Sequence, residues 1–218
     1  MKIVAFIPIK LNNERLPGKN TKSFTNGKPL ISYILETLIS VNKIDEIYVY
    51  CSDESICQYL PEGVSFLQRK SYLDLSTTSF NEVLTTFAEA IEADIYVLAH
   101  ATAPFIRKKS FEVGIDALVS GKNDSALSVK KMQEFIWRNN LPFNYDPSKI
   151  PRTQDLESFY IETCGMYIFT RDLIIKEKRR IGHHPYLVEV SQIEATDINN
   201  LEDFLLADAI YNTLIKKE

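Results

Sequence analysis

The sequence predicts an α/β fold in which a mostly parallel sheet carries helices on both faces. Short apolar runs alternate along the chain with segments whose apolar residues recur every three or four positions. This alternation of strands and helices is typical of parallel sheets. The run Ile95–Ala99 is apolar throughout, as expected of a central strand covered on both sides. With 218 residues, the chain is predicted to form one domain over residues 1–218.

Net charge, cysteine spacing and the lengths of apolar runs limit the partners and the compartment that can be expected for this protein. The formal net charge of −4 argues against a nucleic-acid partner. The three cysteines, Cys51, Cys57 and Cys164, lack zinc-site spacing, so we interpret them as small buried side chains in a reducing, cytoplasmic compartment. The run Ile3–Ile9 is too short to span a membrane and lacks a cleavage site, so no membrane association is expected.

The first half of the chain yields three strands and two helices. Strands are predicted at residues 3–9, 46–50 and 64–68. Pro29 suits the first turn of a helix, and the apolar residues after it follow helical spacing. Ser52 is expected to cap a short helix after the second strand. A second helix is predicted to open at Ser79 and Glu82, which have the spacing of a capping box.

The second half repeats the alternation and adds an excursion. After the strand at residues 95–99, a helix over 108–120 is predicted to stop at Gly121. Further strands are predicted at 125–129, 162–169 and 186–190, with a charged, solvated helix over 171–180. Asn139 and Asn140 lie between aromatic residues, which predicts a hairpin that leaves the sheet. Asn199 is expected to cap the last helix.

A loop rich in cations follows the first strand. Lys10, Arg15 and Lys19 lie on it, with Gly18 for permissive backbone. Because α/β sheets bind anionic ligands beyond the carboxyl ends of their strands, this loop is predicted to bind phosphate. The spacing fits neither the P-loop nor the dinucleotide fingerprint, since no glycine precedes Gly18 and Asn20 replaces the hydroxyl residue. For any one lysine alone, a solvated loop is the alternative.

The stretch IPIKLNNERLPGKN resembles the opening signature of the acylneuraminate (CMP-sialic acid) cytidylyltransferases and of the related CMP-Kdo synthetases. RLPGK at residues 15–19 is similar to the Kdo branch, whereas KN at 19–20 and GKPL at 27–30 are similar to the sialic-acid branch. Lys10 stands where the family usually has arginine. The resemblance implies the nucleotide-diphospho-sugar transferase fold, a Rossmann-like variant.

Later segments extend the resemblance and assign the ligand-binding residues. His100-Ala101-Thr102-Ala103-Pro104 resembles the family's Gln-x-Thr-Ser-Pro and lacks the acidic Asp-Glu-Pro of the Kdo pattern. A surface arginine is the alternative for Arg69, and a satisfied, half-buried histidine the alternative for His100. The nucleotide-binding residues implied are Ile9, Lys10, Asn20, Arg69 and Ser79. The sugar-binding residues implied are His100, Thr102, Arg152, Gln154 and Tyr167.

The resemblance also implies an assembly. In the family, the region corresponding to residues 131–160 is an arm exchanged between two subunits, so a homodimer is expected. Aromatic residues on this excursion are consistent with an interface, and packing back on the core is the alternative. Within the same region, Arg152 lies on a loop implied to face the sugar, where an arginine can pair with a carboxylate.

The implied reaction joins CTP and a sialic-acid-type acidic sugar to give a CMP-sugar and pyrophosphate. Lys10, Arg15 and Lys19 are the expected catalytic residues, because they offset charge on the triphosphate and the departing pyrophosphate. Asp197 and Asn199 match the family's Asp-x-Asp or Asp-x-Asn, which places Mg²⁺ there.

Three other functions are also compatible with this sequence. The first is a cytidylyltransferase for Kdo or another sugar acid. The second is sugar activation with a different nucleotide. The third is a non-catalytic nucleotide-sugar-binding protein, suggested by the departures at Lys10, His100 and Asn199. Lysine keeps the charge of arginine but loses its bidentate geometry.

Overall fold

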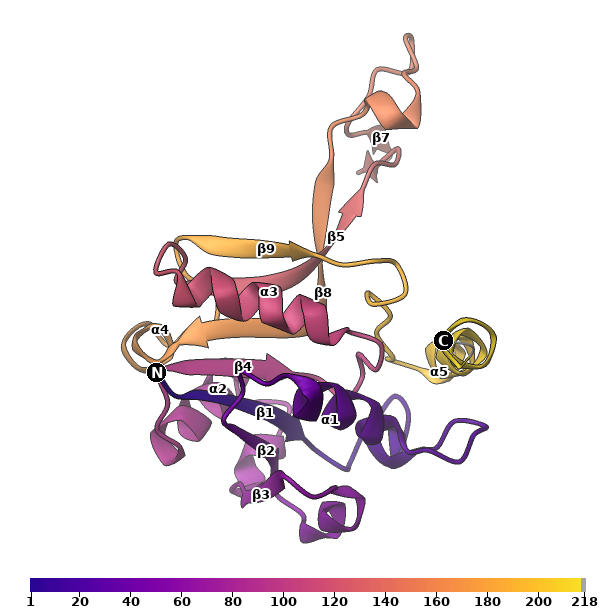
Figure 1. Cartoon of the computed structure of the whole chain (residues 1–218). Helices are drawn as coiled ribbons and strands as arrows, with labels where there is room; N and C mark the ends of the chain where they lie inside the picture. Colours follow the sequence, from indigo (N-terminus) through magenta and orange to yellow (C-terminus); the bar gives the residue numbers. More distant parts are fainter. Residues whose placement is uncertain (217–218) are drawn as a thin grey trace.

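The computed structural model describes residues 1–216 and confirms the α/β fold, with a seven-stranded sheet in the order β3-β2-β1-β4-β8-β5-β9 (Figure 1). Residues 217–218, which the predicted domain includes, lie outside the described part. The antiparallel strand is β8, which pairs with both β4 and β5, while the other neighbours are parallel. The strands are β1 (Ile3–Ile9), β2 (Glu46–Cys51), β3 (Val64–Gln68), β4 (Ile95–Ala99), β5 (Ser125–Met132), β8 (Phe159–Thr170) and β9 (Pro185–Glu189).

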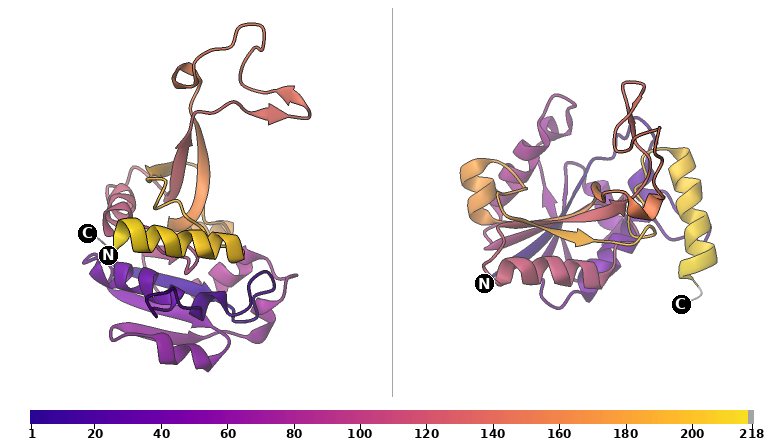
Figure 2. Two further views of the ribbon diagram at one scale, coloured as in Figure 1. Left: turned by 90° about the vertical axis from the view of Figure 1, so that its right-hand side faces the viewer. Right: turned by 90° about the horizontal axis from the view of Figure 1, so that it is seen from above.

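Helices cover both faces of this sheet. On one face α1 (Leu30–Ser40) and α3 (Lys108–Val119) pack on the strands, and on the other α2 (Phe80–Ala90) and α4 (Arg171–Glu177) do so (Figure 2). Strand β1 is apolar at every position because both of its faces are buried. Ala5 and Ile7 belong to the hydrophobic core beneath α1 and α3, and Val4 and Phe6 to the core beneath α2 and α4. Side chains alternate between the faces of a strand, so a strand buried on both sides needs apolar residues at every position.

The C-terminal segment packs beside the loop that follows β1. Here α5 (Leu201–Ile210) continues into a wider turn, η5 (Tyr211–Ile215). A separate aromatic cluster joins them to the N-terminal half through Phe24, whose ring lies 5.0 Å from that of Phe204 and 5.1 Å from that of Tyr33. Four short 3-10 helices complete the main body and the arm: η1 (Lys19–Thr21), η2 (Glu54–Tyr59), η3 (Ser71–Asp74) and η4 (Thr153–Asp155).

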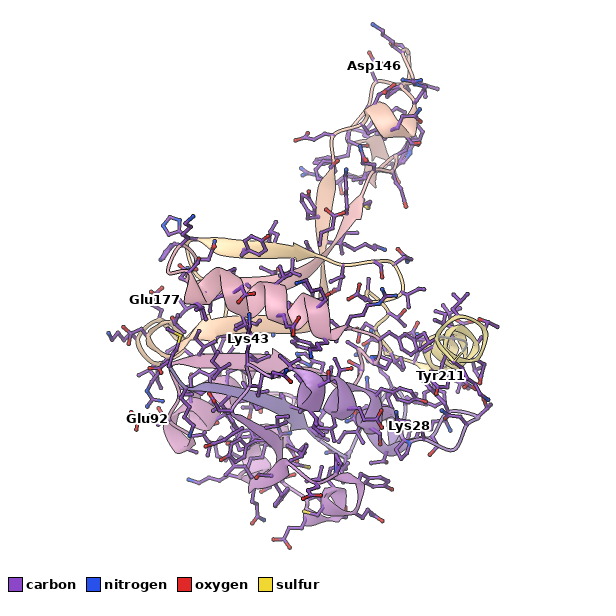
Figure 3. All side chains as sticks on the ribbon, in the orientation of Figure 1. Lys28, Lys43, Glu92, Asp146, Glu177 and Tyr211 are labelled. Carbon is purple, nitrogen blue, oxygen red and sulfur yellow. The ribbon has the colours of Figure 1, made fainter. Side chains whose placement is uncertain are left out.

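The predicted excursion is present as an arm that projects from the sheet on the extended strands β5 and β8 (Figure 1). It carries the hairpin β6 (Trp137–Arg138) and β7 (Leu141–Pro142). Asn139 and Asn140 have φ angles of 53° and 60°, the left-handed pair that a tight two-residue hairpin turn requires. Figure 3 marks Asp146 near the far end of this arm.

Two predicted helix caps are wrong. Asp53, not Ser52, caps η2 by accepting from the Ser55 amide, while the Ser52 hydroxyl donates to Asp74. At the last helix the cap is Asn200, whose side chain and that of Asp203 form a reciprocal capping box. The acidic residue three positions after a cap closes such a box. Counting back from Asp203 therefore leads to Asn200, one residue after the predicted Asn199.

Two predictions about charge and burial also need correction. Cys51 is buried, but Cys57 and Cys164 are exposed, and Cys164 has a left-handed φ of 56°. The charged helix ends at Glu177 because Lys178 adopts a left-handed conformation. Its first residue, Arg171, is not simply solvated, since the guanidinium donates to Ala88 O and Tyr96 Oη. Within residues 1–216, every helix is too short or too polar to cross a bilayer.

Candidate active site

The loop after β1 is held in a fixed shape by contacts within itself. Leu16 is buried in the aromatic cluster, and Gly18 has a left-handed φ of 65° just before η1. The buried Asn20 amide donates to Lys10 O at 3.1 Å, which closes the loop between its two ends. Asn20, predicted to bind nucleotide, thus acts first as the support of this loop.

Lys19 joins this loop to two distant parts of the chain. Its Nζ donates to Ile198 O at 2.9 Å, and Ile198 N donates to Thr102 O at 2.9 Å. The segment containing Asp197 and Asn199 therefore sits between the loops that follow β1 and β4. These are the carboxyl ends of adjacent parallel strands, where α/β sheets place their ligands. We call this arrangement the lysine clamp, meaning Lys19, Ile198 and Thr102.

Opposite charges meet at the clamp. Burial lowers the pKa of Lys19, and the nearby Arg15 acts in the same direction, whereas Asp197 and Asp203 oppose the shift. The Asp197 carboxylate accepts from the Asn199 amide at 2.7 Å, so these two predicted metal ligands lie side by side. The site thus contains an anion beside clustered cations, not a purely basic surface.

Two cavities open next to the loop. The loop cavity, about 250 Å³, is lined by the three predicted catalytic residues. Its lining is Lys10, Asn13, Glu14, Arg15, Leu16 and Lys19. The arginine cavity, about 290 Å³, is lined by Lys10, Arg69 and Phe80 among others. Lys10 borders both cavities, so one elongated anionic ligand can contact it from either side.

Arg69 is buried, which rules out the interpretation as a surface arginine. Its Nε donates to Asp74 at 3.0 Å, and its guanidinium lies 5.8 Å from the ring centre of Tyr50. Ser79 caps α2 by accepting from the Glu82 amide at 3.2 Å, which places the next residue, Phe80, at the wall of the arginine cavity.

His100 is held in an apolar setting at the end of β4. Its Nε2 is buried and has no hydrogen-bond partner within residues 1–216, and its ring stacks on Phe80 with 5.7 Å between centres. Burial lowers the pKa of His100 to about 4, and Arg180 and Lys19 act in the same direction. The imidazole is therefore neutral at pH 7. The alternative of a satisfied histidine is wrong for this nitrogen.

The side chains of four predicted ligand residues are not available to a ligand at this site within one chain. Arg152 and Gln154 lie on the arm, where Arg152 is 72% exposed and pairs with Asp155. The Tyr167 ring belongs to the core, and its hydroxyl donates to Glu162 at 2.7 Å. The Ile9 side chain is buried, so only its main chain can face a ligand.

The residues present fit a magnesium ion only in part. Within the described part of the chain, no three acidic, histidine or cysteine side chains are grouped as metal ligands. Asp197 and Asn199 supply one carboxylate and one amide oxygen from neighbouring positions. Mg²⁺ is commonly held by one or two carboxylates together with substrate phosphates. The pair therefore suits an ion that arrives with a phosphate ligand.

Sequence reasoning missed several side chains that shape the site. Asp74 accepts a hydrogen bond from Arg69, and the Phe80 ring stacks on that of His100. Arg180 lies over the rings of both Tyr167 and Phe80. All of these except the Arg69–Asp74 pair join residues from different elements, which a local pattern does not reveal. For Arg180, the one sequence signal was its position in a charged run that we interpreted as solvated.

A further cavity lies elsewhere in the described part of the chain. It has a volume of about 520 Å³ and is lined by residues of α1, the loop after β4 and the C-terminal segment, including Lys28 and Tyr211, which Figure 3 labels. None of the predicted site residues lines it. Lys28 there is already paired with Glu36. Size alone does not identify a site, and the convergent polar groups are at the lysine clamp.

Comparisons of sequence point to one family. A family model described as "Cytidylyltransferase" matches residues 4–212. Pseudaminic acid cytidylyltransferase of Campylobacter jejuni is 24% identical, and the alignment covers 97% of this chain and 97% of that protein. N-acylneuraminate cytidylyltransferase of Streptococcus agalactiae is 23% identical over 94% of this chain, which spans only 52% of that protein's length. 3-Deoxy-manno-octulosonate cytidylyltransferase of Escherichia coli is 25% identical, and the alignment covers 79% of this chain and 74% of that protein.

Comparisons of structure agree on the fold. CMP:2-keto-3-deoxy-manno-octonic acid synthetase, solved with CTP, superposes with a TM-score of 0.73 at 16% identity, covering 97% of this chain and 99% of that one. 4-Diphosphocytidyl-2C-methyl-D-erythritol synthase of Anaerococcus prevotii gives a TM-score of 0.69 at 15% identity, and the superposition covers 97% of this chain and 96% of that one.

Proposed function

This chain belongs to the cytidylyltransferase family, and from that premise we propose that it transfers the cytidylyl group of CTP to an acidic sugar of the sialic-acid type. The products are a CMP-sugar and pyrophosphate. The observation that carries this proposal is the lysine clamp, which gathers the cationic loop after β1, the loop after β4 and the Asp197 segment at one edge of the sheet.

The loop cavity binds the triphosphate in this proposal. The anomeric hydroxyl of the sugar attacks the α-phosphorus in line, and pyrophosphate leaves from the opposite side. Phosphoryl-type transfers depend mostly on positioning and on offsetting charge. Lys10, Arg15 and Lys19 line the cavity and stabilise the negative charge that accumulates on the leaving group. Lys19 is already fixed by its bond to Ile198 O, so it needs little reorganisation to act.

Magnesium enters the proposal through Asp197. The Asp197 carboxylate and the Asn199 amide would hold the ion, which would offset phosphate charge and lower the pKa of the sugar hydroxyl when bound. Since this chain offers one carboxylate where two would bind more tightly, the ion is expected to bind weakly until CTP contributes oxygens.

The remaining predicted residues divide between the two substrates. Arg69, Ser79, Asn20 and the main chain of Ile9 are assigned to the nucleotide, and Arg69 lines the arginine cavity. His100 and Thr102 lie at the end of β4, on the sugar side. A neutral imidazole at this position can donate to a sugar hydroxyl through one nitrogen and accept through the other.

A homodimer completes the proposal. The arm exposes apolar side chains, with Trp137 60%, Leu141 67% and Phe143 50% exposed. Exposed apolar residues that cluster on a projection favour a protein partner. In a twofold dimer, the arm of one subunit would carry Arg152 and Gln154 toward the site of the other. Neither side chain has a role at the site of its own chain.

We favour a sialic-acid-type substrate over Kdo for one reason from this sequence. The turn after β4 reads His-Ala-Thr-Ala-Pro and carries no acidic residue. The alignment with the pseudaminic acid enzyme of Campylobacter jejuni, which covers 97% of this chain, is consistent with that choice.

The direct test measures pyrophosphate release with Mg²⁺, each of the four nucleoside triphosphates, and a panel containing N-acetylneuraminate, pseudaminate and Kdo. Release that requires both CTP and a nonulosonic acid is the expected result. Release with Kdo alone would shift the assignment to the Kdo branch. Release in no combination would favour a binding protein.

A further inference from the structure

Arg180 is a cation without an acidic partner among residues 1–216. It follows α4, is half-buried, and forms no ion pair within residues 1–216. Its neighbour Arg179, in contrast, lies 3.4 Å from the Glu177 carboxylate. The nearby acid Glu162 accepts instead from the Tyr167 hydroxyl at 2.7 Å. A half-buried charge that no protein carboxylate offsets is costly. An anionic ligand would remove that cost.

Two aromatic rings hold the Arg180 guanidinium in place. Its Cζ lies 3.7 Å from the ring centre of Tyr167 and 5.3 Å from that of Phe80. Such contacts occupy the faces of the planar group and leave the N–H donors at its edge. A guanidinium fixed in this way presents paired donors that match a carboxylate.

The same rings connect Arg180 to the site. Phe80 stacks on His100 and lines the arginine cavity together with Lys10. Arg180 is also close enough to His100 to act on its charge. The contacts therefore lead from the cavity that Lys10 and Phe80 line to His100, and from Phe80 to Arg180 and Tyr167. Arg180 is absent from the linings of both the loop cavity and the arginine cavity, which the loop cations border.

This arrangement gives the site two separate sets of cations. Lys10, Arg15 and Lys19 line the cavity for the triphosphate, and Arg180 lies outside that lining, against the rings of Phe80 and Tyr167. The proposed reaction has two anionic groups, the triphosphate and the carboxylate of the sugar. We infer that Arg180 binds the sugar carboxylate and is a specificity-determining residue that each chain supplies to its own site. This inference rests on the proposed function.

Arg152 is the competing candidate for the same carboxylate. It is 72% exposed, and its Nε donates to Asp155 at 2.8 Å, so its fork already has a carboxylate partner. It also lies on the arm, and only the arm of a second chain could bring it to the site. Arg180 lies in the same chain as the site, and in the described part of the chain it has no carboxylate partner to give up.

The test compares N-acetylneuraminate with its methyl ester, which lacks the charge, in wild type and in Arg180→Met, Arg180→Lys, Arg179→Met and Arg152→Ala. Kdo and its methyl ester replace this pair if Kdo is the acid that wild type accepts. Methionine keeps part of the apolar stem, and Arg179→Met is the matched control for removing a neighbouring arginine. Pyrophosphate release gives the KM of each substrate, and thermal unfolding checks the fold.

Arg180→Met is expected to raise the KM of the acid at least about tenfold while the KM of CTP changes by less than about twofold. Wild type should prefer the acid to the ester, and this preference should vanish in Arg180→Met and return in part in Arg180→Lys. Arg179→Met should behave as wild type.

Two results would overturn the inference while leaving the proposed function intact: an unchanged preference for the acid in both Arg180 variants, or a preference lost only in Arg152→Ala. Wild type that releases no pyrophosphate from CTP with N-acetylneuraminate, pseudaminate or Kdo would remove the proposed function and this inference together. If Arg180→Met does not fold, Arg180→Lys decides by the same acid-to-ester ratio.

Discussion

Lys19 is the side chain on which the geometry of the site depends most directly. It lines the loop cavity and donates to Ile198 O, so it contributes both charge and position. A lysine that is partly buried also loses hydration, which strengthens its interaction with a phosphate that replaces the water. Three exposed lysines on a mobile surface would not offer this combination.

Lys19→Ala is expected to lower kcat/KM for CTP at least about tenfold, a loss of ~1.4 kcal/mol of transition-state stabilisation. Steady-state pyrophosphate release provides the measurement. Lys22→Ala is the matched control, because Lys22 is an exposed lysine three residues along and lies outside the loop cavity. Equal rates in both variants would remove the loop from the mechanism.

His100 makes stability depend on pH in a predictable direction. Its pKa is about 4 in the folded chain against an ordinary value of 6.5, so the folded state resists protonation. The stabilisation is fully present above pH 6.5 and is lost as the pH falls through 4. The full effect is ~3 kcal/mol, since one pKa unit corresponds to about 1.4 kcal/mol.

Replacing His100 with glutamine should therefore flatten the acid side of the stability curve. We expect the free energy of unfolding of wild type to fall more steeply than that of His100→Gln between pH 6.5 and 4, as measured by urea titration. Parallel curves for the two proteins would show that the imidazole is not kept neutral by its surroundings.

At the scale of elements, the segment before α5 combines a helix cap with the predicted metal ligands. Asn200 and Asp203 close the capping box, Asn199 supports Asp197, and Ile198 is held from both sides. Four adjacent residues thus carry three different tasks. This close spacing explains why a substitution one position away is expected to have a different outcome.

Asn200→Ala should cost ~1 kcal/mol of unfolding free energy through the lost cap.

Asn199→Ala should leave stability nearly unchanged and raise the magnesium concentration needed for half-maximal turnover. Asp197→Asn should reduce turnover even at saturating magnesium, because a neutral amide is a weaker ligand for a hard cation. A magnesium titration of all three variants separates these effects. Wild-type turnover in Asp197→Asn, or turnover that persists in excess EDTA, would contradict the metal assignment.

Most elements could be predicted from the sequence because their signals are local. The Asn139-Asn140 turn, the stop at Gly121 and the apolar run of β4 each depend on neighbouring residues. From the residues themselves the site was predictable only where it lies on one loop, as with Lys10, Arg15 and Lys19, whereas Arg69, His100, Thr102 and Asp197 were implied by the resemblance. Arg180 and Phe80 meet across elements about 100 residues apart in the chain, and no periodic pattern records that contact. The shift of the last cap by one residue reflects two adjacent asparagines with equal capping ability.

At the scale of the whole molecule, the arm projects away from the rest of its own chain (Figure 1) and leaves apolar side chains uncovered. It extends from the sheet (Figure 2). The arm exposes aromatic side chains, among them Trp137 and Phe143. We expect a homodimer at micromolar concentration by light scattering. Trp137→Ser together with Phe143→Ser should shift the population toward monomer, since both side chains are at least 50% exposed. A wild-type monomer would contradict the dimer.

The fate of the α-phosphorus of CTP tests the central claim most directly. CTP labelled at that atom would be incubated with Mg²⁺, N-acetylneuraminate and wild-type protein, and the products separated by mass spectrometry, with Lys19→Ala alongside. The proposed in-line transfer predicts that the label enters a CMP-sugar one for one with pyrophosphate, and that Lys19→Ala forms this adduct at least about tenfold more slowly. Label recovered only as free CMP, or CTP left intact with every nonulosonic acid supplied, would contradict it.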